Sequence, residues 1–198
     1  MEALKNLLNR LSSELILGAL VAVLSILAAV SGYQGGMADS KQTEHNVLGQ
    51  KDLTNANSEY LTANQMIVYD YQLFDGYYTA TTPELEDYYQ SQYSEPLQAA
   101  IAANPDDIFT EAYYDEMYAV ANEQFASADA QFELAGKYNE RGDALQLVLM
   151  ISALAVAFAA WASLLEAGSS VRVVFAILSM VGLVYTIVLY VQVPGAPA

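Results

Sequence analysis

Three carboxylates at helical spacing form the strongest candidate for metal chemistry in this chain. Asp107, Glu111 and Asp115 recur every four residues, with two further acids beside them. On a helix this spacing places the side chains on one face, and carboxylate oxygens are the ligands that Ca²⁺ prefers. The same acids fall in the first turns of a predicted helix, where negative charge complements the helix dipole. Because no D-x-D-x-D-G loop is present, we favour the dipole interpretation and keep calcium as the alternative.

The other reactive residue types are too isolated to form an active site. His45 is the single histidine, and the chain contains no cysteine. A transition-metal site would therefore need a partner chain. Serines such as Ser127 have no nucleophile elbow around them, and no glycine-rich phosphate loop occurs. We predict no bound cofactor and no enzymatic activity.

Twelve of the 15 tyrosines lie between positions 60 and 138, several of them as adjacent pairs. Neighbouring positions on a helix point about 100° apart, so one ring of each pair at most can lie at the centre of a packed seam. Tyrosine is common at protein interfaces because it buries a large ring and keeps a polar tip. These pairs are therefore either peripheral core residues of a bundle or a surface for assembly. The candidates for assembly are Tyr77, Tyr78, Tyr88, Tyr89, Tyr113 and Tyr114.

Three apolar runs, at 15–33, 144–165 and 171–193, are long enough to position these residues relative to a membrane. At about 1.5 Å per residue each run spans about 28 to 35 Å as a helix, and a hydrocarbon core is roughly 30 Å thick. A backbone in lipid must satisfy its own hydrogen bonds, which requires helices here. The sequence predicts an integral membrane protein. Apart from Arg172 and Gln192 at the two ends of the third run, the polar side chains within the runs are serines, a threonine and a glutamine. None is an acid or a histidine, which disfavours ion or proton transport.

The segment 37–142 between the first two runs carries 19 acidic and four basic residues, most of the net charge of −16. Such a field disfavours nucleic acid and anionic lipid as partners. Large residues recur every seven positions in two stretches. They are Leu53, Tyr60, Ile67 and Phe74, and later Tyr118, Phe125 and Phe132. The second apolar position is mostly alanine, with Tyr77 at one place and the charged Asp70 as the one exception. We predict an all-α fold in which a helix at 38–78 and one that begins after Pro105 form an antiparallel, coiled-coil-like hairpin. Between them, Thr82 and Pro83 begin a helix that Pro96 should kink or split.

The chain is accordingly divided into seven segments. These are a cytoplasmic interfacial helix at 1–13, a first transmembrane helix at 14–36, an acidic extracytoplasmic module at 37–142, a second transmembrane helix at 143–166, a turn at 167–170, a third transmembrane helix at 171–193 and a tail at 194–198. The interfacial helix rests on the spacing of Leu4, Leu7, Leu8 and Leu11. The basic residues Lys5, Arg10 and Arg172 lie in two short segments, which places the N-terminus in the cytoplasm. We interpret the first run as a retained anchor in the plasma membrane, although Ala29-Val30-Ser31 resembles a signal-cleavage site.

Small residues at four-residue spacing permit close helix contacts in lipid. Gly18 and Ala22 lie in the first run, and Gly32 and Gly36 lie at its outer end. These contacts are either within one chain or between protomers.

The stretch Asn55-Ala56-Asn57-Ser58-Glu59-Tyr60, with Phe132, Ala135 and Arg141 before the second run, resembles a group of small prokaryotic three-span membrane proteins known as a domain of unknown function. The resemblance implies topology alone.

Together these patterns favour a non-enzymatic membrane protein that assembles, either with itself or as an accessory subunit of a larger complex. Its expected partners are membrane lipid and other membrane-protein subunits, with no nucleic acid. The alternatives are a sensor-like helical bundle that signals through a partner, and an oligomeric pore.

Overall fold

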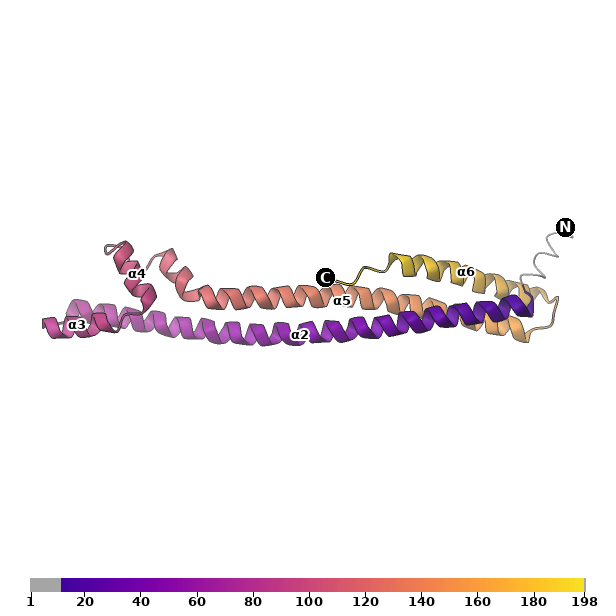
Figure 1. The fold of residues 1–198 in the computed structure, drawn as a ribbon, viewed down its shortest axis with the longest axis horizontal. Helices are drawn as coiled ribbons and strands as arrows, with labels where there is room; N and C mark the ends of the chain where they lie inside the picture. Colours follow the sequence, from indigo (N-terminus) through magenta and orange to yellow (C-terminus); the bar gives the residue numbers. More distant parts are fainter. Residues whose placement is uncertain (1–11, 198) are drawn as a thin grey trace. The chain divides into compact units, whose positions relative to one another are not determined.

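A computed structural model describes residues 12–197, which form five helices and contain no strand (Figure 1). The helices are α2 (Glu14–Thr79), α3 (Pro83–Ser91), α4 (Glu95–Ala103), α5 (Glu111–Leu164) and α6 (Ser170–Gln192). The prediction of an all-α fold is confirmed for this part of the chain. The leucines of the predicted interfacial helix lie outside the described residues.

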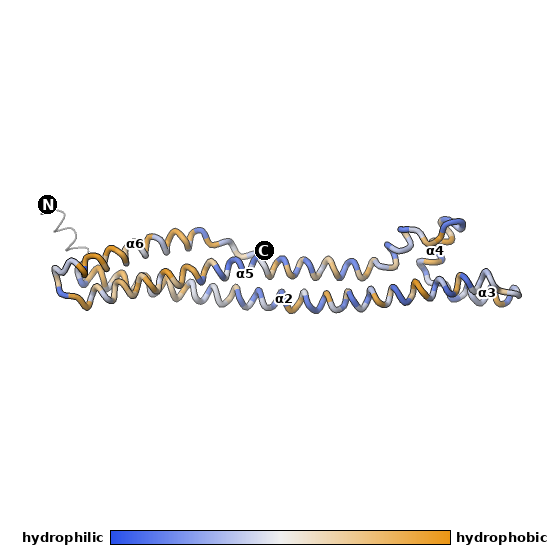
Figure 2. The backbone as a smooth tube through the Cα atoms, turned by 180° about the vertical axis from the view of Figure 1, so that it is seen from behind, coloured by the Kyte–Doolittle hydropathy of each residue, from blue (hydrophilic) through white to orange (hydrophobic). Residues whose placement is uncertain are grey.

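Three helices, α2, α5 and α6, are long and apolar enough to cross a membrane. Figure 2 shows the hydrophobic residues concentrated along α6, the first half of α2 and the last half of α5. The predicted number and order of apolar helices is therefore confirmed. Helix α2 continues through Gly35 and Gly36 without a break, so the first predicted span and the first predicted polar helix form one element.

The chain divides into two compact units. The first, here called the apolar unit, contains the described residues up to His45 and those from Glu133 onward. The second, here called the aromatic unit, is Asn46–Phe132. Helices α2 and α5 contribute residues to both units.

Leucines packed on alanines form the core of the apolar unit. Leu17, Leu20 and Leu24 of α2 are buried together with Ala155, Ala159 and Ala162 of α5 and Ala176 of α6. A Cβ added at Gly182 of α6 would lie 2.6 Å from the Cβ of Ala155, so these two helices approach closely at that point. Apolar side chains gain little from leaving lipid, and close packing over small residues is the main stabilising contribution there.

Arg172 is buried at the turn between α5 and α6, with 3% of its surface exposed. Its Nε donates to the carbonyl of Ser12 and one terminal nitrogen donates to the carbonyl of Leu165, both at 2.9 Å. Gly168, with φ of +87°, supplies the left-handed turn between the helices. The guanidinium thus links the segment before α2 to the turn that follows α5.

In the aromatic unit, side chains of α2 contact side chains of α5 in antiparallel order. Ser127 donates to Asp52, Tyr118 to Asn64 and Tyr113 to Asp70, each at 2.8 Å. Three alanines are buried between these polar contacts, namely Ala56, Ala63 and Ala121, and a fourth, Ala128, is buried next to Ser127. A Cβ on Gly49 would lie 2.8 Å from the ring of Phe132, so a large ring there packs against a bare backbone.

The segment between α2 and α5 contains two short helices with hydroxyl caps. Thr82 accepts a hydrogen bond from the backbone N–H of Leu85 at 3.4 Å, and Ser94 accepts one from Leu97 at 3.2 Å. Pro96 lies in the first turn of α4, where its missing N–H costs nothing, and the predicted split of this segment is confirmed.

The start of α5 differs from the prediction that it follows Pro105 directly, because α5 begins at Glu111. The N–H of Asp106 donates to the Asn104 side chain at 3.2 Å, which forms a local turn instead of a helix start. Ile108, which follows this turn, is buried in the core of the aromatic unit. Burial of this side chain and the local turn outweigh the preference of proline for a first helical position.

Candidate functional site

The most connected polar group of the aromatic unit is the carboxylate of Asp70. Asp70 is 1% exposed and lies on α2. It accepts hydrogen bonds from the Ser94 N–H at 3.3 Å, the Ser94 hydroxyl at 2.5 Å and the Tyr113 hydroxyl at 2.8 Å. Because Ser94 also caps α4, this one carboxylate links α2, α4 and α5. Three donors compensate for the loss of water around a buried charge.

The phenol of Tyr113 is held in its protonated form. Burial raises its pKa well above the usual value, and the hydrogen bond to Asp70 raises it further. A neutral phenol donates a hydrogen bond to a carboxylate, whereas a phenolate would repel it. Tyr113 and Asp70 therefore form a structural pair rather than an acid and base available for catalysis.

Each of the three predicted tyrosine pairs has one ring that is more buried than the other. Tyr113 is 2% exposed, whereas Tyr78 is 69% and Tyr88 is 57% exposed. The pair partners Tyr77, Tyr89 and Tyr114 are half-buried. The structure thus uses one ring of each pair in or beside the core and leaves Tyr78 and Tyr88 at the surface.

Aromatic contacts continue along the aromatic unit. Tyr71 and Tyr114 share a hydrogen bond of 2.5 Å between their hydroxyls, and the Tyr71 ring stacks on Phe109 with centroids 4.0 Å apart. Tyr60 stacks on Tyr118 at 5.0 Å. The hydrogen bond to Tyr71, followed by burial, raises the pKa of Tyr114. These tyrosines bridge α2 to α5 and its preceding loop.

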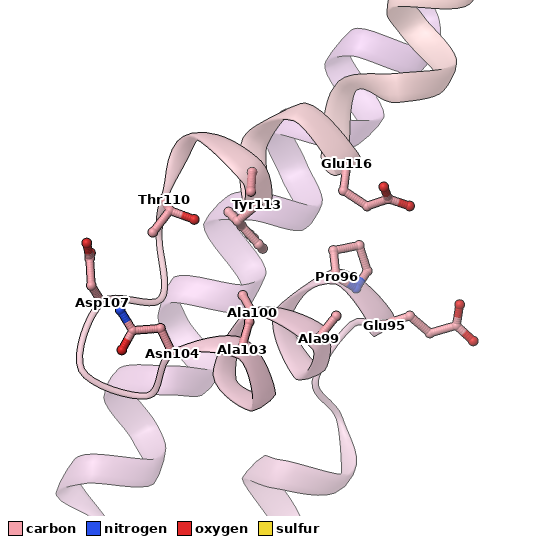
Figure 3. A pocket seen from close by; sticks show the side chains of 11 residues that line it. Glu95, Pro96, Ala99, Ala100, Ala103, Asn104, Asp107, Thr110, Tyr113 and Glu116 are labelled. Atoms are coloured by element: carbon pink, nitrogen blue, oxygen red, sulfur yellow. The ribbon is translucent and has the colours of Figure 1, made fainter.

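A groove of about 450 Å³ lies beside α4 and the start of α5 (Figure 3). Acidic, amide and apolar side chains line it, among them Glu95, Asn104, Asp107, Tyr113 and Glu116. Of the three carboxylates predicted as a calcium site, Asp107 lines this groove, whereas Glu111 and Asp115 do not. Within residues 12–197 there is no group of three His, Asp or Glu side chains placed to hold a metal ion.

The small residues of α2 point in different directions in the apolar unit. A Cβ on Gly32 would lie 3.6 Å from Leu149 of α5, so Gly32 faces the intramolecular packing. Gly18 and Gly36 have no described atom within 4 Å of an added Cβ, and Ala22 is exposed. Three of the four candidate positions therefore remain available for lipid or another protein.

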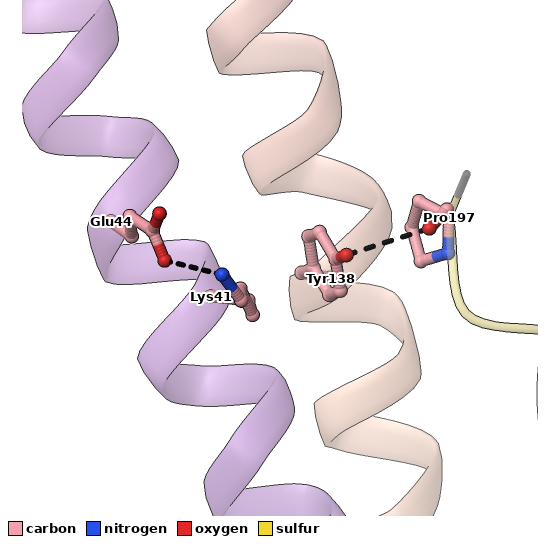
Figure 4. Close-up of polar contacts among 4 residues, drawn as sticks. All are labelled: Lys41, Glu44, Tyr138 and Pro197. Carbon is pink, nitrogen blue, oxygen red and sulfur yellow. Dashed lines mark hydrogen bonds and ion pairs between the residues drawn. The ribbon is translucent and has the colours of Figure 1, made fainter.

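Contacts of the C-terminal segment in the apolar unit were not predicted. The Tyr138 hydroxyl donates to the Pro197 carbonyl at 3.5 Å (Figure 4). Arg141 donates to the Pro194 carbonyl. On α2, Lys41 pairs with Glu44 at 2.7 Å, and this hydrogen bond raises the pKa of Lys41. His45 stacks on Tyr138 with centroids 5.4 Å apart. A short Pro-Gly-Ala segment has no periodicity from which such contacts could be derived.

No family model, no curated protein and no solved structure matches this chain. The aromatic unit combines a hydrogen-bonded core at Asp70 with exposed aromatic rings, and the apolar unit has outward-facing small residues.

Proposed function

We propose that this chain is a non-enzymatic integral membrane protein that assembles, with itself or as an accessory subunit of a larger membrane complex. Helices α2, α5 and α6 cross the plasma membrane, and the N-terminus is cytoplasmic. The polar segment between α2 and α5 forms an antiparallel helical hairpin outside the cell. Support comes from the apolar character of the three helices and from the antiparallel contacts at Asp52, Asn64 and Asp70.

The observation that carries the proposal is the large amount of apolar surface on α2 in the aromatic unit. Nine large hydrophobic side chains of α2 are exposed there: Val47, Leu48, Tyr60, Leu61, Met66, Val68, Tyr69, Tyr71 and Tyr78. In residues 111–132 of α5, all of which the structure describes, Val120 is the single exposed large hydrophobic side chain. Scattered exposed apolar residues are normal, and Tyr60 and Tyr71 also contact α5. The larger number on α2 than on α5 supports a role of α2 in contacts with another protein.

The proposal is tested by native mass spectrometry of the full-length protein, released from its membrane in mild detergent. We expect multimers or a stable complex with another membrane protein. A variant with Tyr78→Ser and Tyr88→Ser removes two exposed rings without touching the Asp70 core, and its complexes should dissociate more readily. Detection of the unaltered protein solely as a monomer would contradict an assembly role.

A second candidate function, an extracytoplasmic sensor that signals through a partner, is favoured by the groove beside α4. A volume of about 450 Å³ with mixed polar and apolar walls is suitable for a small molecule. Ligand-dependent stabilisation of the full-length protein in a thermal screen of small metabolites would support this function. The Ala99→Trp variant, which fills the groove, should abolish that stabilisation.

A further inference from the structure

A second groove, of about 660 Å³, lies between α2 and α5 in the apolar unit. On α2 its wall is formed by glycines, which have no side chains to fill it: Gly32, Gly35 and Gly36. On α5 its wall is apolar and is formed by Leu147, Leu149, Met150 and Ala153. This space is here called the glycine groove.

The contacts within the chain leave the glycine groove open. A Cβ added at Gly32 would lie 3.6 Å from Leu149, so the two helices meet at this glycine. A Cβ added at Gly36 has no described atom within 4 Å, and Met150 on the facing helix is 60% exposed. The apolar wall is therefore accessible to another molecule.

One end of the glycine groove is polar and negatively charged. Asp39 of α2 and Gln146 of α5 line this end, and the Gln146 amide donates to the Asp39 carboxylate at 3.3 Å. A Cβ added at Gly142 would lie 2.6 Å from the other oxygen of Asp39, so the bare backbone there leaves room for the carboxylate. Among the described residues that line the groove, none is basic. The polar end thus favours an occupant with a positive charge.

The glycine groove extends from the apolar part of both helices to their polar part. The first apolar run ends at residue 33 and the second begins at residue 144, so Gly32 and Ala153 lie within the runs and Asp39 lies beyond them. With α2 and α5 across a membrane, the apolar walls lie beside acyl chains and Asp39 lies near the headgroups. Water does not fill apolar space at that depth. A lipid or another protein therefore has to cover the walls.

We propose that the glycine groove binds a phospholipid whose headgroup ends in an ammonium group, such as phosphatidylethanolamine. The inference rests on the proposed function, because it requires α2 and α5 to cross a membrane. One acyl chain packs along the glycines against Leu149 and Met150, and the ammonium group donates to the Asp39 carboxylate. The same carboxylate repels an anionic headgroup that has no ammonium group.

A transmembrane helix of another protein is the other occupant that glycines on a helix face would admit. The carboxylate at the end of the groove distinguishes the two. It favours a molecule that joins an apolar chain to a positive charge at the membrane surface, which is the composition of an ammonium-bearing phospholipid.

Native mass spectrometry of the full-length protein in mild detergent tests the proposal with two added lipids that have identical acyl chains. Phosphatidylethanolamine carries a primary ammonium group, whereas phosphatidylglycerol has a net negative charge and no ammonium group. We expect the unaltered protein to retain about fivefold more phosphatidylethanolamine, the difference that one partly exposed ion pair provides. Asp39→Asn removes the charge but keeps an oxygen that accepts from Gln146, and this variant should retain the two lipids equally.

A matched pair of glycine variants tests the location. Gly36→Leu places a side chain in the groove, and Gly18→Leu makes the same change at another glycine of α2 that does not line it. A Cβ added at either position has no described atom within 4 Å, so both variants should fold. Gly36→Leu should lower retention of phosphatidylethanolamine to the level of phosphatidylglycerol, and Gly18→Leu should leave retention unchanged. Circular dichroism checks that both variants keep their helices.

The outcomes separate this inference from the proposed function. Equal retention of the two lipids by the unaltered protein would overturn recognition of the headgroup. Equal retention of phosphatidylethanolamine by the two leucine variants would show that the lipid binds elsewhere. If Gly36→Leu separates multimers and leaves lipid retention unchanged, another protein occupies the groove. In these three cases, multimers of the unaltered protein would still support assembly. Recovery of the protein from cells without detergent would contradict both the inference and the proposed function.

Discussion

The apolar unit and the aromatic unit contain parts of the same two helices, α2 and α5, but satisfy their buried groups differently. In the apolar unit leucines pack on alanines, and the buried Arg172 donates to backbone carbonyls. In the aromatic unit the buried Asp70 accepts from side chains and one backbone N–H. The two units thus use different stabilising contacts, although both contain parts of the same two helices. A helix in lipid must satisfy its hydrogen bonds internally, and the contacts of the apolar unit are compatible with such surroundings.

The largest difference between the two units should appear when the buried carboxylate of Asp70 is removed from the aromatic unit. Asp70→Ala leaves three donors without their acceptor, and we expect a loss of about 3 to 5 kcal/mol of stability in that unit. Hydrogen exchange measured by mass spectrometry should accelerate in α3 and α4 but not at Leu17 to Leu24. Asp75→Ala, at an exposed position on the same helix, is the control and should have little effect. Equal exchange rates in the two variants would show that Asp70 is not a structural centre.

The corresponding change in the apolar unit is Arg172→Leu. Two hydrogen bonds from a charged donor are lost, which should cost about 2 to 4 kcal/mol of stability. Denaturation in mixed detergent micelles, followed by circular dichroism, measures the effect. Arg172→Lys retains the charge but cannot reach both carbonyls. Its stability should therefore lie between those of the unaltered protein and the leucine variant. A leucine variant as stable as the unaltered protein would mean that this turn is held by packing alone.

A smaller effect is expected from adding volume at glycines. Gly182→Val forces its side chain against Ala155 and should destabilise the apolar unit by about 1 to 3 kcal/mol. A Cβ added at Gly18 has no described atom within 4 Å, so Gly18→Val should leave the fold unchanged. If Gly18→Val nevertheless weakens oligomers in native mass spectrometry, that face of α2 contacts another protein. If both variants unfold alike, helix propensity rather than packing explains the result.

The smallest expected effect concerns Tyr113 and pH. Because the pKa of Tyr113 is raised above its ordinary value of 10.0, the folded state retains a proton that the unfolded state releases above that pH. Its contribution is fully present below pH 10 and falls as pH rises further. Tyr113→Phe should remove this loss of stability at alkaline pH. At neutral pH the variant should be less stable by about 1 kcal/mol, because Asp70 no longer accepts a hydrogen bond from Tyr113. Melting temperatures measured across alkaline pH for both proteins test this, and parallel curves would refute it.

Much of the helical structure could be predicted from apolar length and from the seven-residue repeat. Asp70 also left a trace in the sequence, as the charged residue within an otherwise apolar repeat. Its partners could not be predicted, because Ser94 lies in a capping position far along the chain and no local pattern links the two. The start of α5 was misplaced because burial of Ile108 competes with the local preference of Pro105.

Other features left no usable signal. Arg172 reads as an ordinary basic residue next to an apolar run, and its burial follows from where the Ser12 carbonyl lies in the fold.

The location of the aromatic unit on one side of a membrane is tested most directly by thiol labelling of single-cysteine variants in intact cells. We expect a membrane-impermeant maleimide to label Asn122→Cys in the aromatic unit but not Ala167→Cys in the turn between α5 and α6. Labelling of Ala167→Cys should require permeabilised cells, and Leu154→Cys within α5 should stay unlabelled in both conditions. Labelling of Asn122→Cys and Ala167→Cys from the same side, or ready labelling of Leu154→Cys, would contradict a chain that crosses the membrane three times.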